Sequence, residues 1–180
     1  MYFTISSGYQ WLNKNDSTKA SHSETAIKHL VNGIKDSFKK QESIYKINYR
    51  RLRASAGKNI LDSIIKRIES SNVIIFDITD FNRNVLIELG IALYYCSKNR
   101  DISIYIIKEK GSKSVTADLP SDLQGYFISE YAIEKEKVFF KDNNSLRMSI
   151  GGDIKEFFQN LYPKKNIKID ELDENEAILK

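Results

Sequence analysis

Short apolar runs alternate with longer amphipathic segments along the chain. Residues 2–6 (YFTIS) are aromatic and β-branched, which predicts a first strand. Residues 22–40 place apolar side chains at 3.6-residue spacing, which predicts a helix, and residues 43–49 alternate as a second strand. The chain is therefore expected to begin as strand, helix, strand.

The middle of the chain continues this alternation. An apolar stripe over residues 57–70 predicts a second helix, and residues 85–97 predict a third. Residues 72–79 (NVIIFDIT) and 102–107 (ISIYII) are almost continuously apolar, as expected for strands buried on both faces of a parallel sheet. The pattern predicts a three-layer α/β/α fold with a mostly parallel, flavodoxin-like or Rossmann-like sheet, in which strand 72–79 is central.

The last third of the chain is less regular. Residues 108–122 form a polar connection, residues 125–133 predict a short edge strand, and a final helix is expected from residue 152 or 153 to 161. The 180 residues suit one domain, which we place at residues 1–163. Residues 164–180 are rich in Lys, Asp and Glu and are expected to be a charged tail.

Composition excludes several classes of protein. The chain has one Cys, which cannot build a disulfide framework and has no Cys or His neighbours at zinc spacing, so we expect a cytoplasmic protein without a metal. A signal peptide and a membrane-spanning run are also missing from the pattern. The net charge is +4, with 11 basic and 4 acidic residues between Lys14 and Lys58. Charge alone is weak support for a nucleic-acid partner, which we do not expect.

Polar side chains gather where strand 72–79 ends. In open α/β sheets, ligands bind beyond the carboxyl ends of the strands. Asp77 and Asp80 stand at that edge, and Asn82 follows in the turn. With Asn84 as N-cap of the next helix, Glu88 is four residues on and shares its face, so both are expected to look toward the same crevice as Asp77 or Asp80.

Each of these residues also has a structural interpretation. Asp77 and Asp80 can cap the turn and the helix, while Asn82 and Asn84 can be ordinary turn residues. Glu88 is harder to explain in this way because its helix is otherwise apolar, and a carboxylate there must lie in a crevice or be paired.

The stretch of residues 71–93 (SNVIIFDITDFNRNVLIELGIAL) resembles the strand-turn-helix signature of the nucleoside 2-deoxyribosyltransferase-like and TIR-like families. The matching positions are Asp77, Thr79, Asn82, Asn84, Val85, Glu88, Leu89, Gly90 and Ala92. Residues 119–131 (LPSDLQGYFISEY) are similar to a later strand of these proteins. With the first strand and the loop at Gly8, the resemblance covers about residues 2–131.

This resemblance implies cleavage or transfer at an N-glycosidic bond, in nucleosides for one family and in nicotinamide adenine dinucleotide (NAD) for the other. A carboxylate can stabilise the oxocarbenium-like charge at the ribose carbon or capture it as an ester. The candidate catalytic residues are Glu88 and Asp77, and the candidate substrate-binding residues are Gly8, Tyr9, Asp80, Asn82 and Asn84.

Two main hypotheses follow. The first is an N-glycosidase-type hydrolase acting on NAD or a related nucleotide or nucleoside, with the TIR-like resemblance implying bacterial antiviral defence or toxin chemistry. The second is a non-catalytic nucleotide-binding or TIR-like signalling module with homotypic contacts, which leaves a homo-oligomer open. Neither needs a cofactor, because NAD enters as a substrate, and neither involves a membrane.

Overall fold

The computed structural model of the chain describes residues 1–10, 17–41, 44–53, 59–98, 101–111, 123, 126, 128–135 and 137–162. Their strands are β1 (Phe3–Gly8), β2 (Ile47–Arg51), β3 (Val73–Asp77), β4 (Ser103–Glu109), β5 (Ile128–Glu134) and β6 (Lys137–Phe140). Their α-helices are α1 (Ser17–Ser37), α2 (Ile60–Glu69), α3 (Arg83–Lys98) and α4 (Asn143–Leu161), and two short 3₁₀ helices are η1 (Lys39–Gln41) and η2 (Thr79–Phe81).

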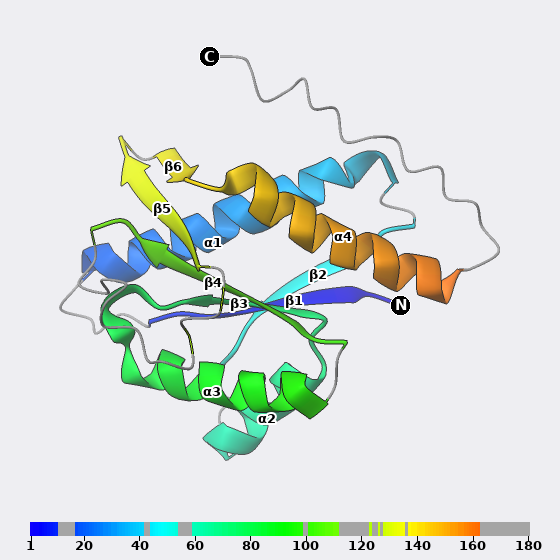
Figure 1. Cartoon of the computed structure of the whole chain (residues 1–180), viewed down its shortest axis with the longest axis horizontal. Coiled ribbons are helices and arrows are strands. Elements are labelled where there is room, and N and C mark those ends of the chain that lie inside the picture. Colours follow the sequence, from blue (N-terminus) through cyan, green and yellow to red (C-terminus); the bar gives the residue numbers. More distant parts are fainter. Residues whose placement is uncertain are drawn as a thin grey trace.

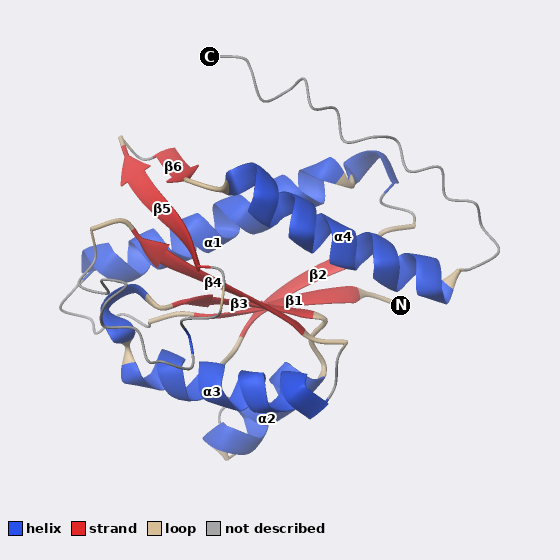
Figure 2. Cartoon of the chain, viewed as in Figure 1, coloured by secondary structure: helices blue, strands red, loops and turns tan. Residues whose placement is uncertain are grey.

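The strands form one sheet in the order β2-β1-β3-β4-β5-β6. β1 to β5 are parallel, and β6 is antiparallel to β5. Helices α1 and α4 cover one face of the sheet, and α2 and α3 cover the other (Figures 1 and 2). The predicted three-layer, mostly parallel α/β/α fold is therefore confirmed.

Strand β3 lies in the middle of this architecture, as its apolar sequence predicts. It pairs in parallel with β1 on one side and β4 on the other, and all five of its residues are buried. Val73 and Ile75 pack into the core under α1 and α4, whereas Ile74 and Phe76 pack into the core under α2 and α3. Side chains of a strand alternate between faces, so this one strand serves both cores.

Two predictions near the C-terminus are wrong. β5 is not the edge strand, because the four-residue β6 pairs outside it through a turn at Lys135, whose φ is +48°. Helix α4 begins at Asn143, not at residue 152 or 153, and runs through Gly151 and Gly152. The apolar stripe of the helix starts at Leu146, and its burial against α1 and the sheet outweighs the poor helix propensity of the glycines.

Other predicted elements keep their identity with shifted ends, which is usual for helix and strand boundaries. The predicted connection at 108–122 starts too early, because β4 continues to Glu109. Residues 112–122 of that connection and the predicted tail at 164–180 lie outside the described residues. Among the helices that are described, none combines the length and apolar character that crossing a bilayer requires.

Candidate functional site

The strand order puts the topological switch point, where a ligand crevice is expected, at the carboxyl ends of β1 and β3. The chain leaves β1 toward β2 through α1 on one face, and leaves β3 toward β4 through α3 on the other (Figure 1). In sheets of this 2-1-3-4-5 order, the point where the strand order reverses is the usual ligand site. Gly8 is the last residue of β1 and pairs with Phe76 of β3, so both border this crevice.

Glu88 of α3 lies directly against the end of β1. A Cβ atom on Gly8 would be 3.0 Å from Glu88 Oε2 and 2.6 and 2.7 Å from two ring carbons of Phe76. Phe76 is fully buried and cannot yield easily. Only a glycine therefore lets the carboxyl group approach the backbone so closely, and the sequence expectation that Gly8 and Glu88 share a site is consistent with this geometry.

The carboxyl group of Glu88 is largely buried without a partner. In the described part of the chain it has no hydrogen bond and no ion pair, and its burial raises its pKa from 4.5 to about 7. Burying an unpaired carboxylate is costly, so folding alone gives no reason to keep it there. Carboxyl groups with perturbed pKa values in clefts are candidates for catalytic work.

This cost predicts a pH-dependent stability difference for Glu88→Gln. The pKa of Glu88 is higher in the folded than in the unfolded chain, so the stability contributed by its protonated form is present below about pH 4.5 and lost as the pH rises through about 7. Glu88→Gln has no charge to bury, so its free energy of unfolding does not fall in this way. We expect it to unfold with a free energy on the order of 1 to 3 kcal/mol above the wild type at about pH 8, and with no difference at about pH 4.

Urea unfolding of both proteins at the two pH values measures the effect. Glu156→Gln is the matched control, because Glu156 is exposed on α4 and its substitution should leave the wild-type pH dependence intact. An equal effect of Glu88→Gln at both pH values would show that Glu88 is not a desolvated carboxyl group.

Asp77 also lies at the end of its strand, but its side chain is on the other face of the sheet. Its Oδ2 accepts a 2.7 Å hydrogen bond from the hydroxyl of Tyr131, which packs in the core under α1 and α4. Phe76, the preceding residue, packs under α3, where Glu88 lies. The expectation that Asp77 and Glu88 look into one crevice is therefore wrong, because successive strand residues point to opposite faces.

The hydrogen bonds of Asp77 hold the loop that follows β3 in place. Oδ1 accepts a 2.9 Å hydrogen bond from the amide of Thr79 and another from its hydroxyl, and the Ser23 hydroxyl of α1 also bonds to this carboxyl group. Burial raises the pKa of Asp77, and these hydrogen bonds oppose the rise. The Thr79 hydroxyl in turn accepts from the Glu109 amide at 2.8 Å, so β3, β4, β5 and α1 are tied together here.

The loop between β3 and α3 is conformationally strained. Asp80 and Phe81 have φ values of +57° and +49°, in the left-handed region that side chains other than glycine rarely adopt. Such conformations persist where surrounding structure holds them and are concentrated at functional sites. Asp80 therefore lies between the end of β3 and the start of α3 in an unusual backbone conformation.

The N-cap of α3 is Asn82, not Asn84 as the sequence predicts. Its Oδ1 accepts hydrogen bonds from the amides of Asn84 at 3.0 Å and Val85 at 3.4 Å. Asn84 is the second residue of the helix and is exposed. Because it precedes Glu88 by four residues, its side chain is still on the face of α3 that carries the carboxyl group.

Tyr9 turns away from Glu88. Its ring is buried in the core under α1, and the Arg51 guanidinium carbon lies 5.3 Å from the ring centroid. Its buried hydroxyl has no hydrogen-bond partner among the residues that the structure describes. Burial raises the pKa of the Tyr9 hydroxyl above its ordinary value. Arg51 pairs with Glu24 of α1. Of the Gly8–Tyr9 pair, the backbone of Gly8 borders the Glu88 crevice, and the side chain of Tyr9 does not.

Sequence reasoning missed Tyr131 and Ser23 as partners of Asp77. They come from β5 and α1, and no local pattern links positions that are 54 residues apart, as Asp77 and Tyr131 are. Across the described ranges, no three His, Cys, Asp or Glu side chains are grouped so that they could hold a metal ion.

The sequence matches no established family and no curated protein. Among solved structures, it is similar to a pilus assembly-related protein from Burkholderia pseudomallei, with 9% identity and a TM-score of 0.42 over 87% of this chain and 91% of that one. It is also similar to the RPS4 and RRS1 TIR domain heterodimer, with 13% identity and a TM-score of 0.42 over 87% and 97% of the two chains. Similarity this distant assigns no residue and no activity, so the functional argument rests on the crevice itself.

Proposed function

We propose that the protein is an N-glycosidase-type enzyme that cleaves the bond between ribose and base in NAD or a related nucleotide or nucleoside. The observation that carries the proposal is the Glu88 carboxyl group, which is largely buried, has no partner among the described residues, has a pKa raised to about 7 and lies against the backbone at Gly8. The resemblance of residues 76–92 to the deoxyribosyltransferase-like and TIR-like signature supports the same assignment.

The chemistry needs a negative charge beside the ribose carbon. When the C1′–N bond breaks, its electron pair leaves with the base, and positive charge develops on C1′ and the ring oxygen. The ionised Glu88 carboxylate stabilises this charge, and its largely buried setting strengthens the interaction relative to water. A water molecule then adds its oxygen to C1′ and loses a proton to the carboxylate or to solvent, which completes hydrolysis.

Because the two candidate catalytic carboxyl groups lie apart, a leaving group that departs without receiving a proton is favoured. Asp77 is engaged on the opposite face, so Glu88 is the member of this pair that faces the crevice. The nicotinamide of NAD carries a positive charge and departs as a neutral molecule without being protonated. A purine leaves a neutral nucleoside only with help from a proton donor. NAD is therefore the favoured substrate, and bacterial defence or toxin chemistry is the setting that the TIR-like resemblance implies.

Incubation of the purified protein with NAD and with a panel of nucleosides and nucleotides tests the proposal. Free base is followed by chromatography, and we expect free nicotinamide from NAD. Release of base from none of the compounds, at protein concentrations close to those of the substrate, would contradict an N-glycosidase.

The second candidate function is a non-catalytic nucleotide-binding or TIR-like signalling module. The orientation of Asp77 favours it, because a site that binds without cleaving has no need of a second carboxyl group. This candidate predicts that a nucleotide binds at the crevice and is recovered intact. Equilibrium binding measured beside the chromatographic assay separates the two functions.

A further inference from the structure

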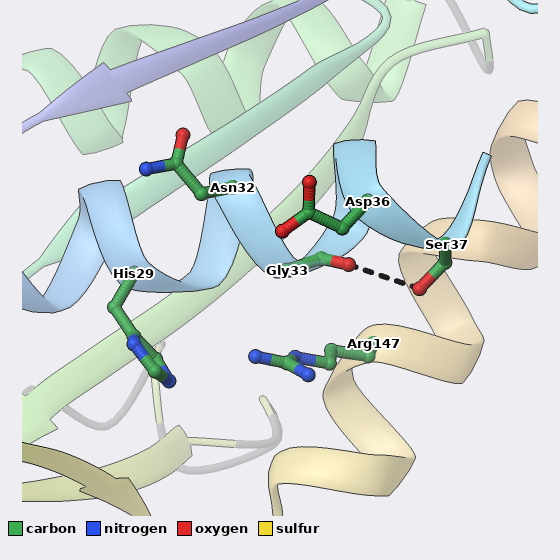
Figure 3. A pocket seen from close by; sticks show the side chains of 6 residues that line it. All are labelled: His29, Asn32, Gly33, Asp36, Ser37 and Arg147. Carbon is green, nitrogen blue, oxygen red and sulfur yellow. Dashed lines mark hydrogen bonds between the residues drawn. The ribbon is translucent and has the colours of Figure 1, made fainter. Parts of the chain in front are cut away.

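A polar hollow lies between α1 and α4, the helices that cover the face of the sheet opposite Glu88 (Figure 3). Its volume is about 400 Å³, and it is lined by His29, Asn32, Gly33, Asp36, Ser37 and Arg147. None of these residues belongs to the crevice at the ends of β1 and β3. The hollow is large enough for a small molecule of a few carbon atoms and one charged group.

Arg147 of α4 lies across the backbone of α1 at Gly33. A Cβ atom on Gly33 would be 2.2 Å from a terminal nitrogen of the guanidinium group and 2.4 Å from its central carbon. Figure 3 shows this side chain reaching from α4 to α1, with His29 one helical turn away along α1. A glycine inside a helix costs about 1 kcal/mol relative to alanine. At position 33 it makes the space in which the guanidinium group lies.

The positive charge of Arg147 is not neutralised within the described residues. Its Nε atom is buried without a hydrogen-bond partner, and the side chain forms no ion pair there. A partly desolvated guanidinium group without an acceptor is unfavourable. Burial and the charge of Arg147 together lower the pKa of His29, as expected beside an uncompensated cation. The hollow therefore presents a guanidinium group whose Nε atom lacks an acceptor among the described residues.

We propose that this hollow binds a small anionic compound through a phosphate or carboxylate group held by Arg147. A guanidinium group presents a planar set of N–H donors that matches either anion in two parallel hydrogen bonds. His29, which lies on the same side of α1 as Arg147 in Figure 3, supplies a further donor. Asp36 also lines the hollow, and its negative charge disfavours a polyanion, so the ligand is expected to carry a single anionic group.

The test is an NMR titration of the whole chain with inorganic phosphate, ribose 5-phosphate and acetate, observing the Nε–Hε group of Arg147 and the ring of His29. We expect saturable shifts with at least one probe, and the strongest probe tells phosphate from carboxylate recognition. Arg147→Gln and Gly33→Ala should each weaken the binding by at least about tenfold. Lys35→Gln, a charge change at an exposed site on the same helix outside the lining, should bind as the wild type does.

Gly33→Ala separates a loss of anion binding from a failure to fold. The added methyl group displaces the flexible end of Arg147 and improves helix propensity, so the variant should fold while losing the anion. Wild-type binding by Gly33→Ala and Arg147→Gln, or shifts that fail to saturate with every probe, would overturn the proposal. A wild-type dimer that Arg147→Gln converts to a monomer, with no response to the probes, would also overturn it by identifying a second copy as the occupant.

Discussion

Glu88→Gln should reduce the rate of base release by a factor on the order of 10² to 10³, which is the usual effect of removing one positioned electrostatic group from a transition state. The substitution keeps the shape of the side chain and removes its charge. Ground-state binding should change little, because the charge is needed mainly when positive charge develops on the ribose. The loss is therefore expected in kcat, with KM close to that of the wild type, and steady-state chromatography of free base measures both.

Two controls make this result interpretable. Glu156→Gln removes an exposed carboxylate from α4 and should release base at the wild-type rate. Circular dichroism should show that Glu88→Gln is folded, since the variant is expected to gain stability above neutral pH. If Glu88→Gln releases base as fast as the wild type, Glu88 is not the catalytic carboxylate.

Asp77→Ala should lower the free energy of unfolding by about 2 to 4 kcal/mol. The substitution removes the acceptor for the hydroxyl of Tyr131 and for the amide and hydroxyl of Thr79, all in a buried setting. Donors left without an acceptor in the interior retain their full desolvation cost. Urea unfolding near neutral pH measures the difference.

Asp77→Asn is the matched comparison for the stability change of Asp77→Ala. The amide keeps the volume and one acceptor oxygen, and the Tyr131 hydroxyl can accept from the new amide donor, so the loss should stay below about 1 kcal/mol. The variant also lacks the charge whose burial raises the pKa of Asp77. If both variants unfold like the wild type but release no base, Asp77 takes part in the chemistry directly.

Hydrophobic periodicity predicts most of the fold. The continuous apolar run at β3 identifies a strand buried on both faces, and the stripes of α1, α2 and α3 identify the layers above and below it. The two failures have clear causes. β6 has only four residues and gains its place by pairing with β5, and α4 contains two glycines whose low propensity is overcome by buried neighbours.

For the candidate site, the sequence indicates which elements carry the residues better than it indicates the directions of their side chains. The signature around Glu88 indicates the helix that borders the crevice, and Gly8 follows from the end of β1. The face on which Asp77 points depends on which helix covers which side of β3, and that is set by the crossovers of the whole sheet. Whether Asn82 or Asn84 is the N-cap of α3 depends on the backbone conformation where the helix begins. The residue types cannot decide this, because both are Asn.

The most direct test of the central claim is an NMR titration of the Glu88 side-chain carboxyl carbon, with and without saturating NAD. In the free protein the carboxyl group should titrate with a pKa near 7, because it is largely buried and has no partner within the described part of the chain. When NAD is bound, its signal and its pKa should shift, since the ribose is expected to lie beside the carboxyl group. A pKa near 4.5 and a signal that responds to neither NAD nor any nucleoside of the panel would contradict the account.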